Sequence, residues 1–276
     1  MNFLTGKDIL ITGAAGSIGC ELVRQVLKHD PRYIYILDHE ETGIFDLWES
    51  NRAKLTPILT DIKLKDEIER YFEKYKPQIV FHAAAYKHVI MGEKFPEIVK
   101  LTNIEGTRNI VEASKKIGVE KLIFISTDKA VEPEGVMGET KKEGERIVKE
   151  AGYISVRFGN VLASRGSVIP LWQKQIERGG PLLITHPDMQ RYFMSISEAG
   201  RLIIKAAEIG KAGEIIALDM GSPIRILELA KTIIKLSGKE IEIKFIGPKP
   251  GEKLFEQLIK DDEVVEKRDE LFIVKS

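Results

Sequence analysis

The stretch STDKAVEPEGVMGETK, which begins at residue 126, gathers side chains that can move protons. Thr127, Asp128 and Lys129 supply a hydroxyl, a carboxyl and an amine in consecutive positions. Lys141 supplies a second amine, and Met137 precedes it by four residues, which places both on one face of a helix. Taken alone, the stretch could equally be a polar loop that leads into an ordinary helix. Its surroundings favour acid–base chemistry.

The residues just before this stretch form the apolar run LIFI at 122–125, whose β-branched and aromatic side chains predict a buried strand. The three polar residues then lie at the carboxyl end of that strand, where open α/β sheets bind their ligands. Similar runs at 9–11, 33–37, 57–59, 79–81 and 154–157 alternate with helical patterns. This alternation predicts an α/β fold with a doubly wound, parallel Rossmann sheet and right-handed crossovers.

The glycine-rich sequence TGAAGSIG follows the first predicted strand and precedes an amphipathic helix. Such a turn brings the backbone and the amino end of the helix close to a pyrophosphate. The residues expected to bind the cofactor here are Gly13, Gly16, Ser17, Ile18 and Gly19. Asp38 ends the next strand, where a carboxylate accepts hydrogen bonds from the adenosine ribose. This acid favours NAD over NADP, although the adjacent His39 weakens the preference.

The next two strands also end in residues that we expect around a dinucleotide. Asp61 and Ile62 can flank the adenine, and the small residues Ala83, Ala84 and Ala85 let a flat ligand approach the backbone. Asn103 interrupts an apolar helical face, so its amide must find partners, and we expect it to order the cofactor side of the sheet. His82, by contrast, is expected to be a hydrogen-bonded core residue.

Beyond residue 159 the elements become shorter and less regular, which predicts a smaller, lid-like α/β domain. We expect residues 1–159 to form an NAD-binding Rossmann domain and residues 160–276 to be mainly substrate-binding, with about 193–220 packing back on the first domain. The elements predicted here are helices at 171–177, 195–209 and 226–236 and strands at 182–184, 215–218 and 241–246. Lys249, Glu252 and Lys253 cluster on a proline-rich loop, either as ligand contacts or as a plain surface turn.

Composition excludes several classes of function. Lys and Arg number 42 against 42 Asp and Glu, so no overall field attracts nucleic acid or an anionic membrane. No run approaches the roughly 18 apolar residues of a membrane span. The single cysteine, Cys20, rules out an internal disulfide and agrees with a reducing cytoplasm, and the five histidines are scattered. We therefore expect a soluble, cytoplasmic protein without a metal site.

The motifs TGAAGSIG, HAAAYKHV, STDKAV, MGETK, RFGNVLASRGSVIP, MQRYFMSI and PGEKL occur in this order. With them, the chain from about residue 7 to 256 resembles the extended short-chain dehydrogenase/reductases. It is most similar to their CapD-like polysaccharide-biosynthesis branch, which includes UDP-N-acetylglucosamine 4,6-dehydratases. The resemblance implies a nucleotide-sugar enzyme with tightly held NAD(P), a Rossmann domain and a smaller substrate domain. The oligomeric state stays open, and we expect a homodimer because such folds often pair through two helices per subunit.

The resemblance assigns the family's Thr-Asp-Lys to Thr127, Asp128 and Lys129, and its Tyr-x-x-x-Lys to Met137 and Lys141. The chain departs from most short-chain dehydrogenases here, because a methionine cannot take the proton of a sugar hydroxyl. The membrane-attached members of the branch are expected to share this methionine and to carry an amino-terminal membrane region that these 276 residues do not include. Met137 is therefore expected only to shape the pocket.

The reaction that the resemblance implies removes water from the sugar. Oxidation at carbon 4 makes the carbon 5 proton acidic, because the new ketone delocalises the carbanion. Lys129 is expected to remove that proton, with an amine kept partly neutral by burial and cationic neighbours, and Asp128 to protonate the leaving 6-hydroxyl. Thr127 is expected to bind the 4-hydroxyl, and Lys141 the nicotinamide ribose. For the 4-hydroxyl proton, we favour a water relayed through Thr127 or Asp128.

By the same resemblance, residues 161–165 pass near the nicotinamide, with Val161 counted among the cofactor contacts. The substrate contacts are expected to be Ala83, Lys87, Asn160, Thr185, Lys249 and Glu252. Lys87 also lies just beyond a strand end on the ligand side, and it can pair with a diphosphate.

Two other functions stay open. One is a nucleotide-sugar epimerase on the same fold, and the other is a non-catalytic NAD-binding protein, for which Met137 is the best argument. The consecutive Asp128 and Lys129 favour dehydration, since epimerisation at carbon 4 needs no acid at carbon 6.

Overall fold

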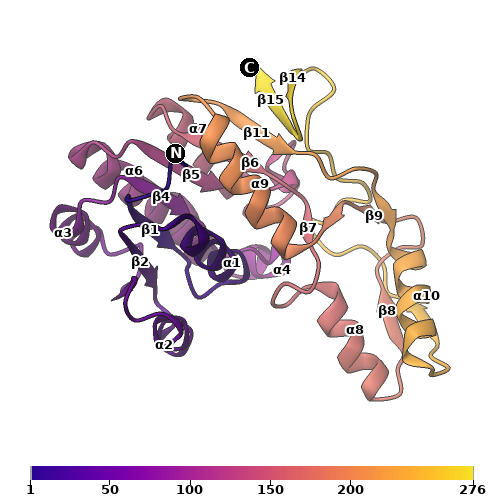
Figure 1. Ribbon diagram of the computed structural model, residues 1–276. Coiled ribbons are helices and arrows are strands. Elements are labelled where there is room, and N and C mark those ends of the chain that lie inside the picture. Colours follow the sequence, from indigo (N-terminus) through magenta and orange to yellow (C-terminus); the bar gives the residue numbers. More distant parts are fainter. Residues whose placement is uncertain (1, 276) are drawn as a thin grey trace.

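The computed structural model describes residues 2–275 and is built around one nine-stranded sheet (Figure 1). The strand order is β14-β15-β11-β6-β5-β4-β1-β2-β3. In chain order the strands are β1 (Asp8–Thr12), β2 (Tyr33–Asp38), β3 (Leu55–Leu59), β4 (Ile79–His82), β5 (Lys121–Ile125), β6 (Ile154–Arg157), β11 (Ile215–Leu218), β14 (Val264–Arg268) and β15 (Leu271–Lys275). From β3 to β11 all neighbours are parallel, so the predicted doubly wound α/β fold is confirmed.

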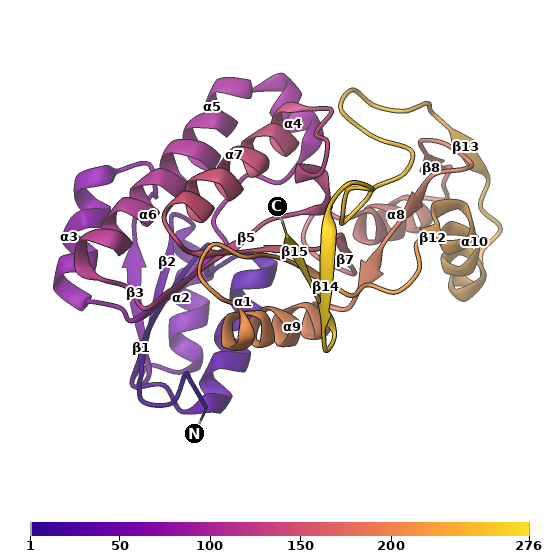
Figure 2. The same cartoon turned by 90° about the horizontal axis from the view of Figure 1, so that it is seen from above.

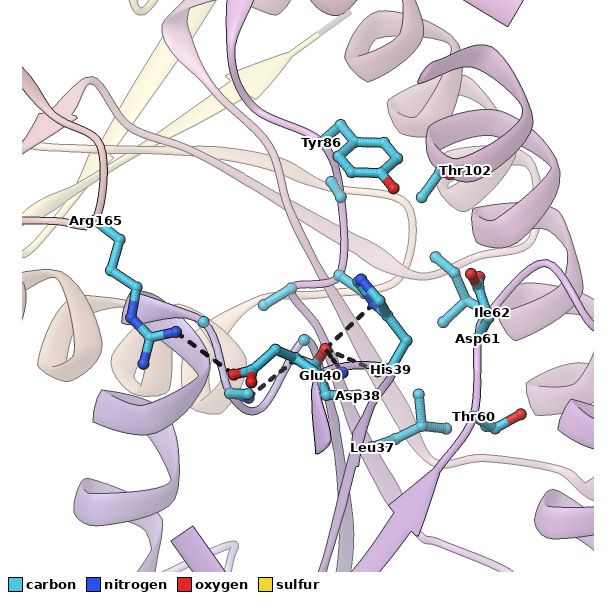
Figure 3. A pocket seen from close by; sticks show the side chains of 16 residues that line it. Leu37, Asp38, His39, Glu40, Thr60, Asp61, Ile62, Tyr86, Thr102 and Arg165 are labelled. Atoms are coloured by element: carbon cyan, nitrogen blue, oxygen red, sulfur yellow. Dashed lines mark hydrogen bonds and ion pairs between the residues drawn. The ribbon is translucent and has the colours of Figure 1, made fainter. Parts of the chain in front are cut away.

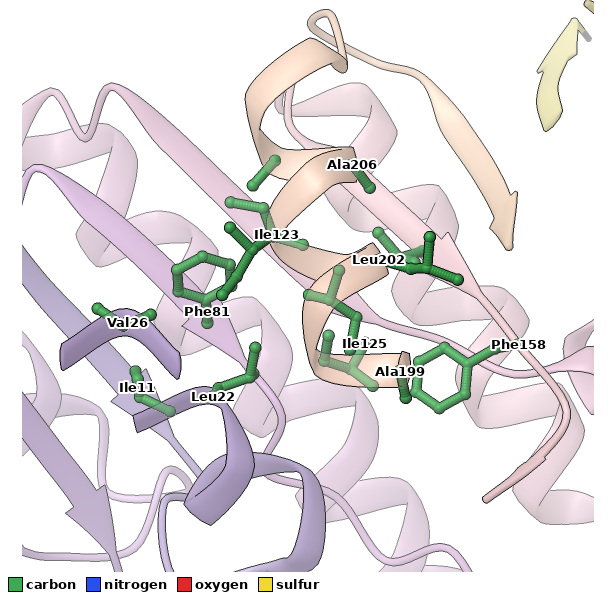
Figure 4. Packing of buried hydrophobic residues seen from close by; sticks show 14 of the residues in the cluster. Ile11, Leu22, Val26, Phe81, Ile123, Ile125, Phe158, Ala199, Leu202 and Ala206 are labelled. Carbon is green, nitrogen blue, oxygen red and sulfur yellow. The ribbon is translucent and has the colours of Figure 1, made fainter. Parts of the chain in front are cut away.

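Helices cover both faces of this sheet because successive strand residues point to opposite sides. On one face Ile11, Phe81 and Ile123 pack against α1 (Ser17–Val26) and α9 (Ile196–Ile209), as Figure 4 shows. On the other face Leu10 and Val80 belong to a second core, which is formed with α3 (Lys65–Tyr75), α6 (Gly106–Ile117) and α7 (Val136–Glu150). The burial of both faces explains why these strands read as continuous apolar runs.

The connections between the strands contain three further helices and a π-helical turn. These are α2 (Glu41–Ser50), α4 (Val89–Lys94), α5 (Pro96–Lys100) and the turn Leu101–Glu105. No helix within residues 2–275 combines the length and the apolar character that a membrane crossing requires.

A smaller lobe extends from the carboxyl edge of the sheet (Figure 2). Its own core surrounds the fully buried Trp172 and joins α8 (Val168–Glu177), α10 (Ile226–Ser237), β8 (Leu182–Ile184) and β13 (Ile243–Phe245). Two short strand pairs connect the lobe to the large sheet: β7 (Asn160–Val161) with β10 (Phe193–Met194), and β9 (Gln190–Arg191) with β12 (Ile224–Arg225). The chain between β10 and β12 returns to the large sheet, where α9 packs on α1 and β11 pairs with β6.

The hairpin β14–β15 closes one edge of the sheet and has no counterpart among the predicted elements. β15 pairs antiparallel with β11, and its Leu271, Ile273 and Val274 are buried. β14 is largely exposed, with Val264 at 65%. A four-residue apolar run, LFIV, becomes part of a strand here because β11 offers it an open edge, which is a tertiary condition that the local pattern does not contain.

Candidate functional site

Two adjoining cavities lie at the carboxyl ends of the parallel strands. The first, of about 280 Å³, runs from the glycine turn across the ends of β2 and β3 (Figure 3). The second, of about 480 Å³, continues from the same turn over the ends of β5 and β6 toward the smaller lobe. The walls that the two cavities share are formed by Gly13, Gly16, Ala83, Ala85, Tyr86 and Arg165. A long ligand can therefore occupy both.

The glycine turn forms a cradle in which side chains have no room. Gly13 has a φ of 68°, and a Cβ at this position would lie 2.6 Å from the amide nitrogen of Ala84. A Cβ on Gly19 would clash with the Gly13 carbonyl oxygen. Helix α1 begins at Ser17 without a side-chain cap and without an acidic residue in its first turn. Its free N–H groups therefore suit an anion.

Asp38 faces the first cavity and is held by the backbone around it. Its Oδ2 accepts a hydrogen bond of 3.0 Å from the amide of Ala15, and its Oδ1 accepts bonds of 2.8 and 3.2 Å from the amides of His39 and Glu40. A carboxylate offers about four acceptor sites, so one is left for a ligand hydroxyl. The His39 ring lies 3.3 Å from the same carboxylate (Figure 3).

The other residues predicted around the dinucleotide line these cavities, with one exception. Asp61, Ile62 and Ala84 line the first cavity, whereas Ser17, Ile18, Gly19, Lys141 and Val161 line the second. Asn103 lines neither, because its buried amide is engaged by the backbone of Tyr86, at 2.8 and 2.9 Å, and by the Thr140 hydroxyl. It orders the loop after β4, whose Tyr86 lines both cavities.

His82 is enclosed below the same loop. It is fully buried between the hydroxyls of Thr12 and Thr107, at 2.7 and 3.0 Å. Burial lowers the pKa of His82 to about 3, with the nearby charge of Lys141 adding to the effect, so the ring is a neutral core residue.

The second cavity brings together Thr127, Lys129, Met137 and Lys141 on one wall. The Lys141 ammonium donates to the Ile125 carbonyl oxygen at 2.8 Å. Burial lowers the pKa of Lys141 to about 8. The amine closest to neutrality in this site is therefore that of Lys141, and not that of Lys129 as the sequence predicts.

Lys129 lies between two carboxylates. Its Nζ is 2.9 Å from Asp128 Oδ1 and 3.5 Å from Glu256 Oε1. Burial lowers the pKa of Lys129, but the charges of Asp128 and Glu256 outweigh it and raise the pKa above its usual value. The expected cationic neighbour is present as Arg191, whose influence is smaller. The expectation of a partly neutral Lys129 is thus wrong for this arrangement, because the nearest charges are negative.

Asp128 is not on the cavity wall. Its side chain is completely buried, and Oδ1 accepts a hydrogen bond of 2.8 Å from the Thr127 hydroxyl, which does line the cavity. Oδ2 has no hydrogen-bond partner. Asp128 can therefore exchange protons with a ligand through Thr127, and its expected role as the acid stays a prediction.

The residues predicted to bind substrate divide into two groups. Lys87 and Asn160 line the second cavity, and burial lowers the pKa of Lys87. Thr185, Lys249 and Glu252 line neither cavity. Thr185 donates to the Met189 sulfur, and the Glu252 carboxylate accepts from the Lys249 amide at 3.3 Å.

Glu256, Arg191 and Glu40 belong to the site but are not among the predicted site residues. Arg165 lines the first cavity, and its guanidinium points toward Glu40 at 3.8 Å (Figure 3). Arg191 is buried against the carbonyls of Lys253 and Leu254, which positions Glu256. The motif PGEKL points to this segment, but nothing in the sequence marks Glu256 as buried. No group of three or more potential metal ligands occurs among residues 2–275.

Comparisons with known proteins show the family of the chain. The family described as "Polysaccharide biosynthesis protein" matches residues 9–275. The capsular polysaccharide biosynthesis protein CapD of Staphylococcus aureus is 46% identical over 95% of the chain, which spans only 46% of that protein. A membrane protein of Methanocaldococcus jannaschii is 44% identical and is covered over 87% of its length. A UDP-glucose 4-epimerase of Rickettsia canadensis is 34% identical and is covered over 80%.

Two solved structures show how far the likeness extends in space. The X-ray structure of Pen from Bacillus thuringiensis is 35% identical, with a TM-score of 0.93 over 99% of this chain and 89% of that one. A dTDP-glucose 4,6-dehydratase of Streptomyces venezuelae, solved with NAD and TYD bound, is 20% identical, with a TM-score of 0.82 over 90% of this chain and 86% of that one. The second likeness concerns the fold alone.

Proposed function

The chain belongs to the polysaccharide biosynthesis protein family, and from that premise we propose that it is an NAD-dependent nucleotide-sugar 4,6-dehydratase. The proposed substrate is a sugar of the UDP-N-acetylglucosamine type, and the product is a UDP-4-keto-6-deoxy sugar. One observation carries the proposal: the Thr127 hydroxyl on the cavity wall donates to the buried Asp128, which also binds the Lys129 ammonium. A hydroxyl, an acid and an amine connected in this way can serve elimination of water.

The residues present fit NAD. The cradle around Gly13 admits backbone but no side chain, the start of α1 suits a pyrophosphate, and Asp38 has acceptor capacity for a ribose hydroxyl. A 2′-phosphate would meet this carboxylate, which favours NAD over NADP. When bound, NAD supplies reversible hydride acceptance.

The Thr127–Asp128 pair offers an answer to the absence of a tyrosine at position 137. The 4-hydroxyl proton passes to the Thr127 oxygen as the Thr127 proton passes to Asp128 Oδ1, over the observed 2.8 Å. Asp128 then holds the proton that the 6-hydroxyl needs in order to leave as water, and it returns the proton through the same hydroxyl. Met137 lines the cavity beside them and shapes it.

Lys129 and Lys141 have different tasks in this proposal. Lys129 lines the second cavity and removes the carbon 5 proton, which it later returns. Lys141 is buried at the junction with the cofactor end, where it binds the nicotinamide ribose and supplies positive potential. Lys87 and Asn160 bind the sugar nucleotide, and Lys249, Glu252 and Thr185 do so if the segment that carries them moves toward the cavity.

Product mass tests the proposal directly. The purified chain is incubated with NAD and UDP-N-acetylglucosamine, and the products are followed by mass spectrometry and NMR. We expect the loss of one water. An unchanged mass with inversion at carbon 4 would favour an epimerase, the activity named for the Rickettsia relatives. No product from any UDP-sugar, with NAD bound, would favour a non-catalytic protein.

We further propose that a second copy of the chain covers an exposed apolar surface along α4, α5 and the π-helical turn. This surface contains Met91 of α4, Phe95 between the two helices, Ile98 of α5 and Leu101 of the turn, which are exposed by 49, 56, 49 and 45%. Charges of both signs flank them, so the surface can pair with itself across a two-fold axis. In light scattering, Phe95→Asp should give a monomer. Leu236→Asp, on a lone exposed leucine of α10, should leave the dimer intact.

A further inference from the structure

Lys129 lines two spaces. One is the second cavity, where the sugar is proposed to bind. The other is a small cavity that offers about 10 Å³ to the centre of a water molecule. The walls of this small cavity include Glu134, Met137, Lys253 and Glu256. A space of this size holds about one water.

Glu256 is an acid that lines the small cavity beside the Lys129 amine. Its side chain is 3% exposed, Oε1 lies 3.5 Å from Lys129 Nζ, and Oε2 is buried without a hydrogen-bond partner. A buried carboxylate oxygen without a donor is costly in free energy, and a proton or a water would relieve that cost. The site therefore contains an acceptor that the proposed mechanism does not yet use.

An amine can act as a base only when it is neutral. The charges of Asp128 and Glu256 instead favour the protonated, ammonium form of Lys129. The proton that it carries must leave before the carbon 5 proton can be taken. Asp128 cannot receive it, since in the proposed function Asp128 takes the 4-hydroxyl proton. The remaining acceptor beside the amine is Glu256.

We propose that Glu256 is a positioning residue that accepts the Lys129 proton, directly or through one water, and so frees the amine to act as the base. This inference rests on the proposed function. An Nζ–H bond breaks and an Oε–H bond forms, so the ion pair becomes a neutral amine and a neutral acid. Lys129 then takes the carbon 5 proton and returns it, and no further acceptor is needed.

The charges around Glu256 make this transfer depend on Asp128. Burial raises the pKa of Glu256, the cations Lys129, Arg191 and Lys253 lower it, and Asp128 raises it. Glu134 faces the small cavity, and Glu252 lies 4.0 Å from Arg191. When Asp128 becomes protonated through Thr127, the Lys129 ammonium loses its closest counter-charge. Protonation of Asp128 also removes its upward effect on the pKa of Glu256, so the transfer depends on the balance between the effects at Lys129 and at Glu256.

The pH profile of turnover tests the proposal. Glu256→Gln keeps size and polarity but cannot take a proton, so kcat at pH 7 should fall about 100-fold, with KM within about threefold. In this variant Glu256 no longer raises the pKa of Lys129, so at about pH 9.5 the amine can release its proton to solvent, and kcat should recover to within about 10-fold of the wild type. Glu256→Asp should retain more activity at pH 7 than Glu256→Gln, and Glu240→Gln, at an exposed position, should match the wild type.

Equal loss in Glu256→Gln at both pH values would show a structural role only and overturn the proposal, as would no loss at either. A second readout does not require turnover. In protein with ¹³C-labelled lysines, the Lys129 signal, assigned with Lys129→Met, should titrate at lower pH in Glu256→Gln than in the wild type. An unchanged titration overturns the inference even in an active enzyme. A wild type that turns over no UDP-sugar refutes the proposed function, while the titration still tests the pair.

Discussion

The two halves of the site are built in opposite ways. The cofactor half takes Gly13 and Asp38 from one strand–helix–strand unit, and backbone amides form most of its contacts. The catalytic half joins Thr127, Asp128 and Lys129 to Glu256, from a segment near the other end of the chain. Figure 2 shows that segment, in yellow, leaving the smaller lobe and passing close to α4. The proposed cofactor binding thus relies on local backbone geometry, and the proposed proton transfer relies on side chains that are distant in the sequence.

The halves also differ in the free energy that they cost. The glycine turn satisfies its polar groups with neighbours or leaves them free for an anion. The catalytic half buries two carboxylates whose Asp128 Oδ2 and Glu256 Oε2 have no hydrogen-bond partner. Buried charges that are incompletely paired destabilise a fold. We expect substitutions in the cofactor half to change NAD affinity and substitutions in the catalytic half to change turnover.

The largest effect is expected from removing the proposed base. Lys129→Ala should lower kcat by about 100- to 10,000-fold, because a positioned acid or base contributes a factor of that size. NAD affinity, measured by calorimetry, should stay within about threefold. Lys142→Ala, at an exposed position of α7, is the control and should be fully active. Full turnover by Lys129→Ala would remove the distinction between the two halves.

Gly13→Ala should act on the cofactor half and abolish NAD binding. The added methyl meets the Ala84 backbone at 2.6 Å in a backbone conformation with φ of 68°. The clash and the strained φ together cost about 2–5 kcal/mol. Gly6→Ala is a matched control, because Gly6 has a φ of 69° but no atom within 4 Å of the added Cβ. Similar NAD affinities for the two variants would contradict the role assigned to the cradle.

Lys141 belongs to both halves, and its charge should appear as a pH-dependent stability. Burial lowers its pKa from 10.5 to about 8, so between these values the unfolded chain binds more protons than the folded one. The free energy of unfolding of the wild type should therefore rise with pH in this window, relative to Lys141→Met, by up to about 3 kcal/mol.

Urea unfolding at pH 7 and at pH 10.5 measures this difference. Lys142→Met should show none, because Lys142 is exposed. The difference in the free energy of unfolding between Lys141→Met and the wild type could instead stay constant with pH. Lys141 would then titrate normally in the folded protein.

The smallest effects concern the substrate lysines. Lys87 lines the second cavity, so Lys87→Ala should raise the KM for the UDP-sugar about 10-fold through a lost charge-assisted hydrogen bond. Lys249 lies outside both cavities, and Lys249→Ala should change KM less than threefold. Lys94→Ala, on the exposed side of α4, serves as control. An equal effect at Lys87 and Lys249 would show that the loop of Lys249 closes over the substrate.

The accuracy of the sequence-based predictions follows the same division. The strands from β1 to β6 and Asp38 at the end of β2 were predictable because strand, glycine turn and helix each follow from neighbouring residues. Helices α2, α4 and α5 were not among the predicted elements. The hairpin β14–β15 was not, since β15 needs the edge of β11. Asn103 was correctly expected to find partners, but its direction, toward Tyr86 and Thr140, depends on how two helices and a loop meet.

The sequence by itself determined the Rossmann fold, the glycine cradle and the gathering of Thr127, Asp128 and Lys129 at the end of β5, because strand ends and turns are local properties. The tertiary structure alone decided the charge of Lys129. It placed Glu256 3.5 Å from the amine, enclosed Asp128 and left Thr127 on the cavity wall. Electrostatic interactions depend on distance in space and on burial, and neither is written in the order of residues along the chain.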